Sequence, residues 1–209
     1  MQKMIRSAYV GAVFVAACAP AAAGTLSASV SDANGAPVAD AVIYAVALGA
    51  RPAVAPRPAI MDQVNKEYFP LVVPVQVGAA VTFPNKDNIR HQVYSFSPAK
   101  VFEMKLYAGT PAKPVVFDKP GAVVLGCNIH DWMVGYIYVV DTPYFAKTGK
   151  AGSARLEALP AGDYQVRVWH PYMRAEPALL SLKLAEGATA VTSFRVELSA
   201  PQKVLPAGK

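Results

Sequence analysis

Apolar and polar residues alternate in short runs along most of the chain. Alternation over four to eight positions is typical of a half-buried β-strand, and turn sequences such as Asp32-Ala33-Asn34-Gly35 separate the runs. The strands predicted in this way cover residues 25–30, 37–46, 71–75, 80–83, 91–96, 101–107, 114–117, 121–125, 136–140, 155–160, 164–170 and 189–198. The pattern therefore predicts an all-β protein.

Two breaks divide the predicted strands into groups. Residues 51–58 form a proline-rich connector that cannot pair as a central strand, and we expect a domain junction there. A second change follows Asp141-Thr142-Pro143, where turn-forming residues replace the dense strands. The interval between the breaks holds about seven short strands, which suits a single β-sandwich.

The composition agrees with a packed β protein. Hydrophobic residues make up 54% of the 209 residues and charged residues only 16%, which argues against a disordered chain. The 18 prolines and 14 glycines cut the chain into short segments and favour a β-sandwich over a helical bundle. The lysines and arginines are scattered without basic runs, so the sequence argues against nucleic-acid binding.

The N-terminus has the pattern of an export signal. Lys3 and Arg6 precede an apolar run over residues 8–17, too short to anchor the chain in a bilayer, and Ala23 ends a small-residue cleavage site. We therefore predict a signal peptide over residues 1–23 and a periplasmic mature protein. Residues 15–18 also resemble a lipoprotein box that would place a lipid on Cys18, but cleavage just beyond the apolar run is favoured. No later stretch predicts a transmembrane helix.

Cleavage after Ala23 changes both the cysteine count and the charge. It removes Cys18 and leaves Cys127 alone, and the loss of Lys3 and Arg6 lowers the net charge from +6 to +4. A lone cysteine in an exported protein suggests an intermolecular disulfide, a reactive thiol or a metal-bound thiolate.

Cys127, His130 and Met133 stand at Cys-x2-His-x2-Met spacing in a short loop between two predicted strands. A thiol, an imidazole and a thioether are soft or borderline donors, which suit copper rather than magnesium or calcium. A fourth donor must come from elsewhere in the chain, and His91 is the first candidate. Two histidines and one cysteine in a plane, with a weak axial methionine, describe an electron-transfer copper site.

The residues alone leave other ligand assignments open. His170 is the other histidine that can supply a second imidazole, but it stands in the last group of strands, where we expect a structural role. Met133 also suits core packing, and Glu103 is a substitute oxygen ligand. Trp132 suits either packing or an apolar docking face around His130.

Cys127 has two further interpretations. It suits a buried structural thiol, since a free cysteine behaves as a small hydrophobic residue. It also suits a nucleophile, but Asp131 is poorly placed to orient the adjacent His130, because neighbouring side chains on an extended stretch diverge. We therefore do not expect an enzyme.

Residues 60–141 resemble the cupredoxins, the superfamily of plastocyanin, azurin and amicyanin. The resemblance rests on the Cys-x2-His-x2-Met loop, on Asn85-x-Asp87 ahead of His91, and on Gly-x-x-x-x-Gly-Cys ahead of the loop. The spacing of Cys127, His130 and Met133 is most similar to that of amicyanin, and the motifs together resemble the periplasmic group labelled "methylamine utilisation protein". The resemblance implies a Greek-key β-sandwich that binds copper through four ligands: His91, Cys127 and His130 as equatorial ligands and Met133 as the axial one.

The sequence departs from that family at two points. Asp131-Trp132 stand where amicyanin-like loops carry a proline and an aromatic residue. Gln92 stands where the family commonly has an Asn or Ser that bridges the two ligand loops.

The flanking segments carry a second resemblance. Residues 24–48 and 149–168 resemble the two halves of a carboxypeptidase-regulatory-like, transthyretin-type sandwich, the second through Leu-Pro-x-Gly-x-Tyr at residues 159–164. We therefore expect a cupredoxin domain over residues 59–142, inserted into a small transthyretin- or Ig-like sandwich built from residues 24–50 and 143–199. Residues 200–209 are expected to form a tail.

The cupredoxin resemblance implies a periplasmic type 1 (blue) copper protein with one copper per chain, which carries single electrons between redox partners. A redox protein is the expected partner, of the c-type cytochrome or the dehydrogenase class. The alternative is a periplasmic copper-binding and delivery protein without electron-transfer turnover. A third interpretation is an adhesion or scaffold module.

Overall fold

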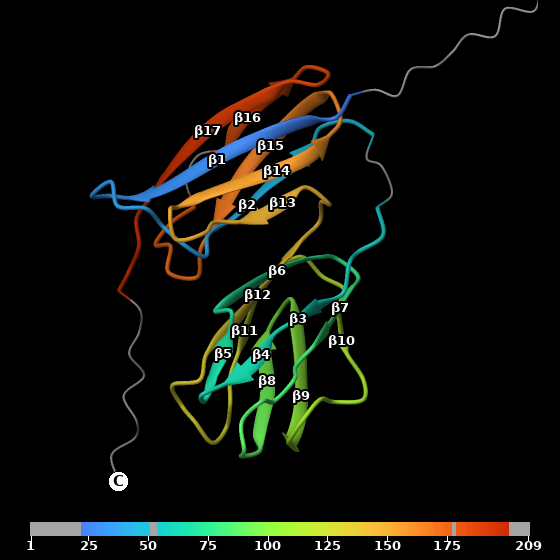
Figure 1. Cartoon of the computed structure of the whole chain (residues 1–209), viewed down its shortest axis with the longest axis vertical. Coiled ribbons are helices and arrows are strands. Elements are labelled where there is room, and N and C mark those ends of the chain that lie inside the picture. The colour runs from blue at the N-terminus through green and yellow to red at the C-terminus, as the bar shows by residue number, and fades with distance from the viewer. Residues whose placement is uncertain (1–21, 51–53, 177–178, 201–209) are drawn as a thin grey trace, which may run out of the picture.

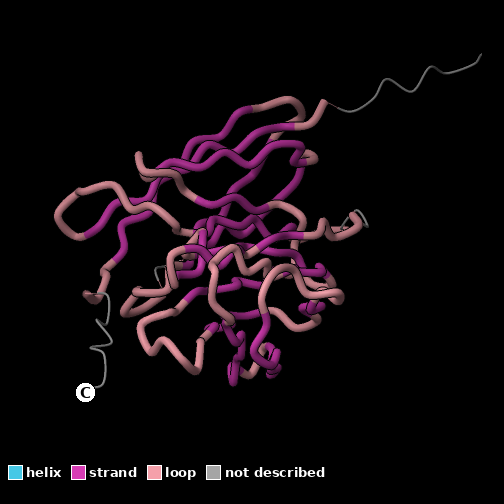
Figure 2. Tube along the Cα trace, turned by 60° about the horizontal axis from the view of Figure 1, so that its bottom comes forward, coloured by secondary structure: helices cyan, strands magenta, loops and turns pink. Residues whose placement is uncertain are grey.

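The computed structural model describes residues 22–50, 54–176 and 179–200. The predicted signal peptide with Cys18, and nearly all of the predicted tail, lie outside these ranges. Within them the chain forms strands and connecting loops without a helix (Figure 2), so the all-β prediction is confirmed. The strands are β1 (Gly24–Asp32), β2 (Val42–Ala47), β3 (Ala59–Ile60), β4 (Asp62–Val64), β5 (Glu67–Phe69), β6 (Val72–Gln76), β7 (Ala79–Thr82), β8 (His91–Ser97), β9 (Lys100–Tyr107), β10 (Val115–Phe117), β11 (Gly121–Leu125), β12 (Gly135–Val140), β13 (Phe145–Lys147), β14 (Ser153–Leu159), β15 (Gly162–Trp169), β16 (Leu180–Leu184) and β17 (Thr189–Val196). The described part of the chain therefore contains no helix that could cross a membrane.

The strands near the two ends of the chain form one layered unit, which we call the outer unit (top of Figure 1). One sheet has the order β14-β1-β17 and the other the order β13-β2-β15-β16. Strand β1 pairs antiparallel with β14 and parallel with β17, so the first strand is hydrogen-bonded to the last. Alternating side chains of both sheets fill a common core, which includes Leu26, Val30, Ile43, Leu156, Leu159, Val166 and Phe194.

Strands β3 to β12 form a second unit, the middle unit (bottom of Figure 1). Its sheets have the orders β10-β7-β3 and β11-β12-β6, with the pairs β4-β5 and β8-β9 beside them. The core of the middle unit includes Val81, Phe83, Phe117, Val123, Leu125 and Ile137. Cys127 and Met133 belong to the same core.

A small apolar cluster, which we call the joint, connects the two units. It contains Val42 of β2, Val72 of β6, and Tyr138 and Val140 of β12, with Trp169 of β15 packed against them. The Trp169 and Tyr138 rings are stacked, with centroids 4.2 Å apart and an interplanar angle of 11°.

The structure differs from the predicted strands at a few short elements. The predicted strand over 37–46 begins only at Val42, because Asp40 has a positive φ of 59° that breaks the extended run. Strands β3, β4, β5, β13 and β16 were not predicted, and four of these five have only two or three residues. The central Pro74 of β6 is tolerated because β6 lies at the edge of its sheet.

Candidate metal centre

Two loops of the middle unit bring the predicted ligands together. His91 is the first residue of β8, and Cys127 follows the end of β11. The N–H of Tyr94 donates to the carbonyl oxygen of Gly126 (3.2 Å), and the N–H of Gly126 donates back to the carbonyl oxygen of Tyr94 (3.0 Å). This pair of hydrogen bonds holds the middle of β8, three residues after His91, beside the residue that precedes Cys127.

The side chains of His91, Cys127 and His130 converge at one buried point. The Cys127 Sγ lies 3.9 Å from His91 Nδ1 and 4.0 Å from His130 Nδ1, and all three donor atoms lie within 4.8 Å of one another. Ligand bonds of about 2.0 Å to nitrogen and about 2.3 Å to sulfur, spread evenly in one plane, place N and S roughly 3.7 Å apart. The observed spacing is therefore close to that of three ligands around one ion.

Asp87 orients the His91 ring through Nε2, the ring nitrogen that does not face Cys127. The Asp87 Oδ2 lies 2.7 Å from His91 Nε2, so a proton held on Nε2 leaves the Nδ1 lone pair facing Cys127. Asp87 is fixed in turn by the backbone N–H groups of Asn65 (2.7 Å) and Lys66 (2.9 Å). Burial alone raises the pKa of Asp87, but the hydrogen bonds from Lys66, His91 and Asn65 outweigh it and lower the pKa below its ordinary value. Asp87 is therefore a carboxylate at neutral pH.

Asn85 shapes the loop that precedes His91. Its side-chain amide donates to the carbonyl oxygens of Ile89 (2.8 Å) and Tyr107 (3.0 Å), and its Oδ1 accepts the N–H of Asp87 (3.0 Å). The Asn85-x-Asp87 pattern thus places the carboxylate on the imidazole.

His130 and Met133 lie on one tight turn. The N–H of Met133 donates to the carbonyl oxygen of His130 (2.9 Å), and the Met133 side chain is buried in the core of the middle unit. Burial, with His91 and Lys66 adding to it, lowers the pKa of His130, so its neutral form is favoured. The Trp132 ring lies against the His130 ring, with centroids 5.0 Å apart, and it is 44% exposed.

The other candidates from the sequence lie elsewhere. His170 is buried in the outer unit, where its Nδ1 accepts the N–H of Tyr172 (3.2 Å). Glu103 is exposed and accepts a hydrogen bond from the Gln92 side chain (2.6 Å). Among the described residues, the His91, Cys127 and His130 group is the one set of three or more His, Cys, Asp or Glu side chains close enough to hold a metal ion.

Sequence reasoning missed Tyr68, which also reaches this centre. Its hydroxyl donates to the carbonyl oxygen of Gly126 at 2.9 Å. Burial, followed by the nearby Cys127, raises the pKa of this phenol. The signal in the sequence was slight, since Tyr68 lies on the three-residue strand β5.

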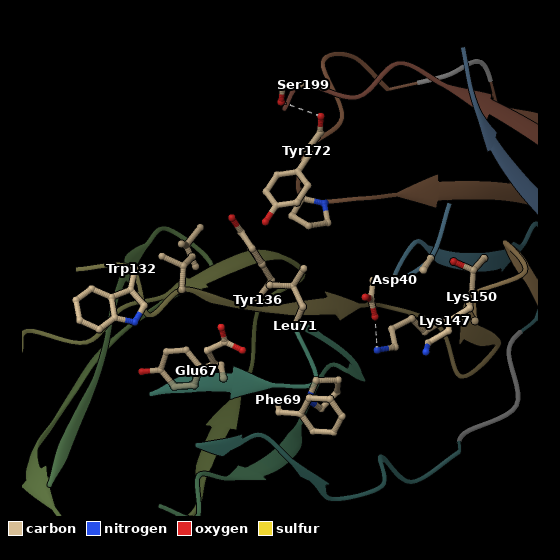
Figure 3. A pocket seen from close by; sticks show the side chains of 18 of the residues that line it. Asp40, Glu67, Phe69, Leu71, Trp132, Tyr136, Lys147, Lys150, Tyr172 and Ser199 are labelled. Atoms are coloured by element: carbon tan, nitrogen blue, oxygen red, sulfur yellow. Dashed lines mark hydrogen bonds and ion pairs between the residues drawn. The ribbon is translucent and has the colours of Figure 1, made fainter. Parts of the chain in front are cut away.

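A cleft of about 1000 Å³ lies beside the metal centre, between the two units. Figure 3 shows Trp132 on one side of it, Tyr136 at its middle, and Asp40 and Lys147 on the far side, where the two form an ion pair of 2.5 Å. Glu67 and Phe69 of β5 line the wall from the middle unit.

Fold and site together define an all-β protein of two units, with two imidazoles and one thiol converging inside the middle unit.

No family model and no curated protein matches the sequence. Among solved structures, the chain is similar to a copper-containing nitrite reductase from Thermus scotoductus SA-01, with 29% identity and a TM-score of 0.38, over 46% of this chain and 25% of that one. It is similar to a purple cupredoxin from Nitrosopumilus maritimus, with 27% identity and a TM-score of 0.34, over 39% of this chain and 96% of that one. It is also similar to the reduced Cu(I) form of an amicyanin variant at pH 4, with 21% identity and a TM-score of 0.36, over 39% of this chain and 80% of that one.

Proposed function

We propose that this chain binds one copper ion through His91, Cys127, His130 and Met133 and carries single electrons in the periplasm. The observation that carries the proposal is the convergence of two imidazole nitrogens and one thiol sulfur within 4.8 Å of one another.

The donor set fits copper better than the other common metals. Two imidazoles and a thiolate, with the Met133 thioether three residues after His130, suit a copper site, whereas magnesium and calcium prefer oxygen ligands. Bound copper supplies a Cu(II)/Cu(I) couple, in which the sulfur ligands favour Cu(I) and the imidazoles retain Cu(II).

The residues around the donors keep them in place. Asp87 fixes the ring and tautomer of His91. Burial of His91 (0% exposed), Cys127 (3%) and His130 (9%) keeps water away from the donors. Because the donors sit on a packed β unit, their positions would change little between the oxidation states of a bound copper ion, which would lower the reorganisation that electron transfer requires.

Trp132 supports electron exchange at the surface beside His130. The His130 ring is largely covered, whereas the Trp132 ring, which lies against it, has 44% of its surface exposed. We propose that electrons enter and leave through His130 and Trp132, with a redox protein as partner, of the c-type cytochrome or dehydrogenase class.

A thiol nucleophile is the competing chemistry, and Asp87 supplies the orienting carboxylate that such a site requires. Two features favour metal binding instead. A second imidazole, from His130, faces the same sulfur, which a Cys-His nucleophile does not need. Cys127 is also 3% exposed, which leaves little room for a substrate at the sulfur.

The domain division is part of the proposal. We propose that residues 59–142 form an inserted domain that carries the metal, and that residues 24–50 and 143–199 form one split sandwich around it. The separate cores of the middle and outer units support this division. The export signal over residues 1–23 rests on the sequence alone.

The first test is the visible and EPR spectrum of the mature protein with one equivalent of Cu(II). We expect an intense thiolate-to-copper band and a small parallel hyperfine splitting, and we expect Cys127→Ser to lose both. His170→Gln is the matched control, because its histidine lies in the outer unit, and it should retain both signals. A Cys127→Ser protein with an unchanged spectrum and copper content would overturn the proposal.

Voltammetry separates electron transfer from copper delivery. Rapid, reversible oxidation and reduction with the metal retained is the result expected of an electron carrier. Loss of copper on reduction, or its transfer to a metal-free acceptor protein, would identify a delivery protein instead.

A further inference from the structure

The hairpin of β4 and β5 lies between the cleft and the metal centre. Strand β5 alternates across its three residues: Tyr68 is buried (4% exposed) and faces the middle unit, whereas Glu67 and Phe69 are exposed (Figure 3). One face of this short strand thus meets the core that carries Cys127, and the other meets solvent in the cleft.

The Tyr68 hydroxyl lies between the two ligand-bearing segments and donates its single proton mainly to the nearer of two carbonyl oxygens. It lies 2.9 Å from the carbonyl oxygen of Gly126, the residue before Cys127. It also lies 3.4 Å from the carbonyl oxygen of Gln92, the residue after His91. The side chain of Gln92 takes no part in this bridge, because it points to Glu103.

The turn of the same hairpin holds the Asp87 carboxylate, which in turn bonds His91. Asn65 and Lys66 both have positive φ, 56° and 61°, which directs their consecutive N–H groups at the Asp87 carboxylate. Asp87 in turn bonds His91 at 2.7 Å. The hairpin therefore reaches His91 through Asp87 and Cys127 through Gly126.

Strand β12 fixes Tyr68 from the opposite side. A Cβ placed on Gly135 would lie 2.7 Å from the Cβ of Tyr68 and 2.9 Å from its Cγ, so only glycine allows this approach. Gly135 follows the loop that carries His130 and Met133, so Tyr68 also packs against the strand that follows those residues.

We propose that the β4–β5 hairpin is a clamp for the metal centre, in which Tyr68 is the positioning residue that sets the separation of His91 and Cys127. This inference rests on the proposed copper function for its ligand, but the clamp is a property of the protein's own contacts. A buried phenol needs a hydrogen-bond partner in any core. Here both possible partners are backbone carbonyls next to proposed ligands, those of Gln92 and Gly126. We therefore expect loss of the Tyr68 hydroxyl to move the ligands themselves.

The test compares Tyr68→Phe with Tyr44→Phe. Tyr68→Phe keeps the ring that packs on Gly135 and removes only the hydroxyl. Tyr44→Phe removes a hydroxyl of matched chemistry that bonds Tyr138 (3.1 Å) outside the metal centre. We expect Tyr68→Phe to shift the thiolate-to-copper band and to weaken copper binding by about tenfold, the lower end for loss of an outer-shell partner. Tyr44→Phe should leave both unchanged.

A metal-free measurement tests the clamp independently of copper. The rate at which iodoacetamide alkylates Cys127 in the metal-free protein reports how firmly the thiol is held. We expect that rate to rise several-fold in Tyr68→Phe and to stay at the wild-type value in Tyr44→Phe.

Gly135→Ala is a second, independent perturbation, because its added methyl displaces Tyr68 from the β12 side. It should shift the copper band in the manner of Tyr68→Phe. Gly49→Ala is its control, since nothing lies within 4 Å of a Cβ at that position.

The outcomes separate the two proposals. If Cys127→Ser retains the wild-type copper spectrum, the copper proposal fails, and the alkylation rates still decide the clamp. If copper binds through Cys127 but Tyr68→Phe and Tyr44→Phe behave alike in the spectrum, affinity and alkylation rate, Tyr68 is an ordinary core residue and the clamp is refuted.

Discussion

At the scale of single residues, the buried His170 makes the stability of the outer unit sensitive to pH. The ring is 6% exposed, its Nδ1 accepts the N–H of Tyr172, and it has a hydrogen bond to the backbone of Ala39. Burial lowers the pKa of His170, although the neighbouring Asp40 and the Ala39 backbone oppose that shift. A neutral ring satisfies both contacts, whereas a proton added at Nδ1 would remove the acceptor that Tyr172 uses.

We therefore expect stability to fall in acid. Because the pKa of His170 is lower in the folded state, the unfolded chain binds the extra proton below about pH 6.5, and the stability present above that pH is lost progressively as the pH falls. One histidine contributes at most about 1.4 kcal/mol per pH unit. Urea unfolding of the metal-free protein at pH 7.5 and pH 5 measures the loss.

His170→Gln is the comparison for this effect, because glutamine can both donate and accept. It should lose less stability between the two pH values than the wild type. His130 acts in the same direction, so some dependence should remain. An equal loss in wild type and variant would show that His170 does not contribute.

At the scale of elements, the β4–β5 turn contains avoidable strain. Lys66 has a φ of 61°, and a residue with a Cβ pays roughly 1–2 kcal/mol in this left-handed region. Two-residue turns of this kind favour glycine at the second position.

Lys66→Gly should therefore stabilise the protein by about 0.5 kcal/mol, after allowing for the greater freedom of glycine in the unfolded chain. The N–H that donates to Asp87 is retained. Urea unfolding of the metal-free protein at pH 7.5 measures the gain. Lys66→Ala removes the same charge but keeps a Cβ, so it should bring no gain; an equal gain from alanine would assign the effect to the lysine side chain instead.

The same hairpin illustrates how far sequence patterns reach. Strands such as β8 and β15 alternate over seven or eight residues, which is enough for the period to be recognised. Strands β4 and β5 have three residues each and are joined by Asn65-Lys66 rather than Asn-Gly, so neither length nor turn chemistry singled them out.

The candidate metal centre was likewise predictable only in part. Cys127, His130 and Met133 are close in sequence, so their spacing alone predicted one site. His91 had to be chosen over His170, and the structure brings it to Cys127 through the pairing of Tyr94 with Gly126. Tyr68 was not predictable, because its partners are backbone carbonyls, which every residue has and no side-chain pattern reports.

At the scale of the whole molecule, the joint couples the two units. The Trp169 ring of the outer unit stacks on Tyr138 of the middle unit at 4.2 Å. Truncation of a buried tryptophan typically costs about 3–5 kcal/mol, and Trp169 is only partly buried, so the loss should fall near the lower end. The loss is concentrated in the contact between units, since the two main cores do not include this ring.

Trp169→Ala should therefore separate the unfolding of the two units. Calorimetry of the metal-free wild type should give one transition, and the variant should give two. Trp132→Ala, which removes the other tryptophan of the chain from a site away from the joint, should keep a single transition. A single transition in Trp169→Ala would mean that the remaining joint residues suffice for coupling.

The pairing of β1 with β17 also determines the order in which the two units can be completed as the chain emerges from its N-terminus. Val30 of β1 lies beside Phe194 of β17, and the ribosome makes every strand of the middle unit between them. Strand β12 can meet β6 and β11 as soon as it is made, whereas β1 must wait for β14 and then β17. The middle unit can therefore fold first, while the strand that was translated earliest has an unpaired edge until the sheet closes over it.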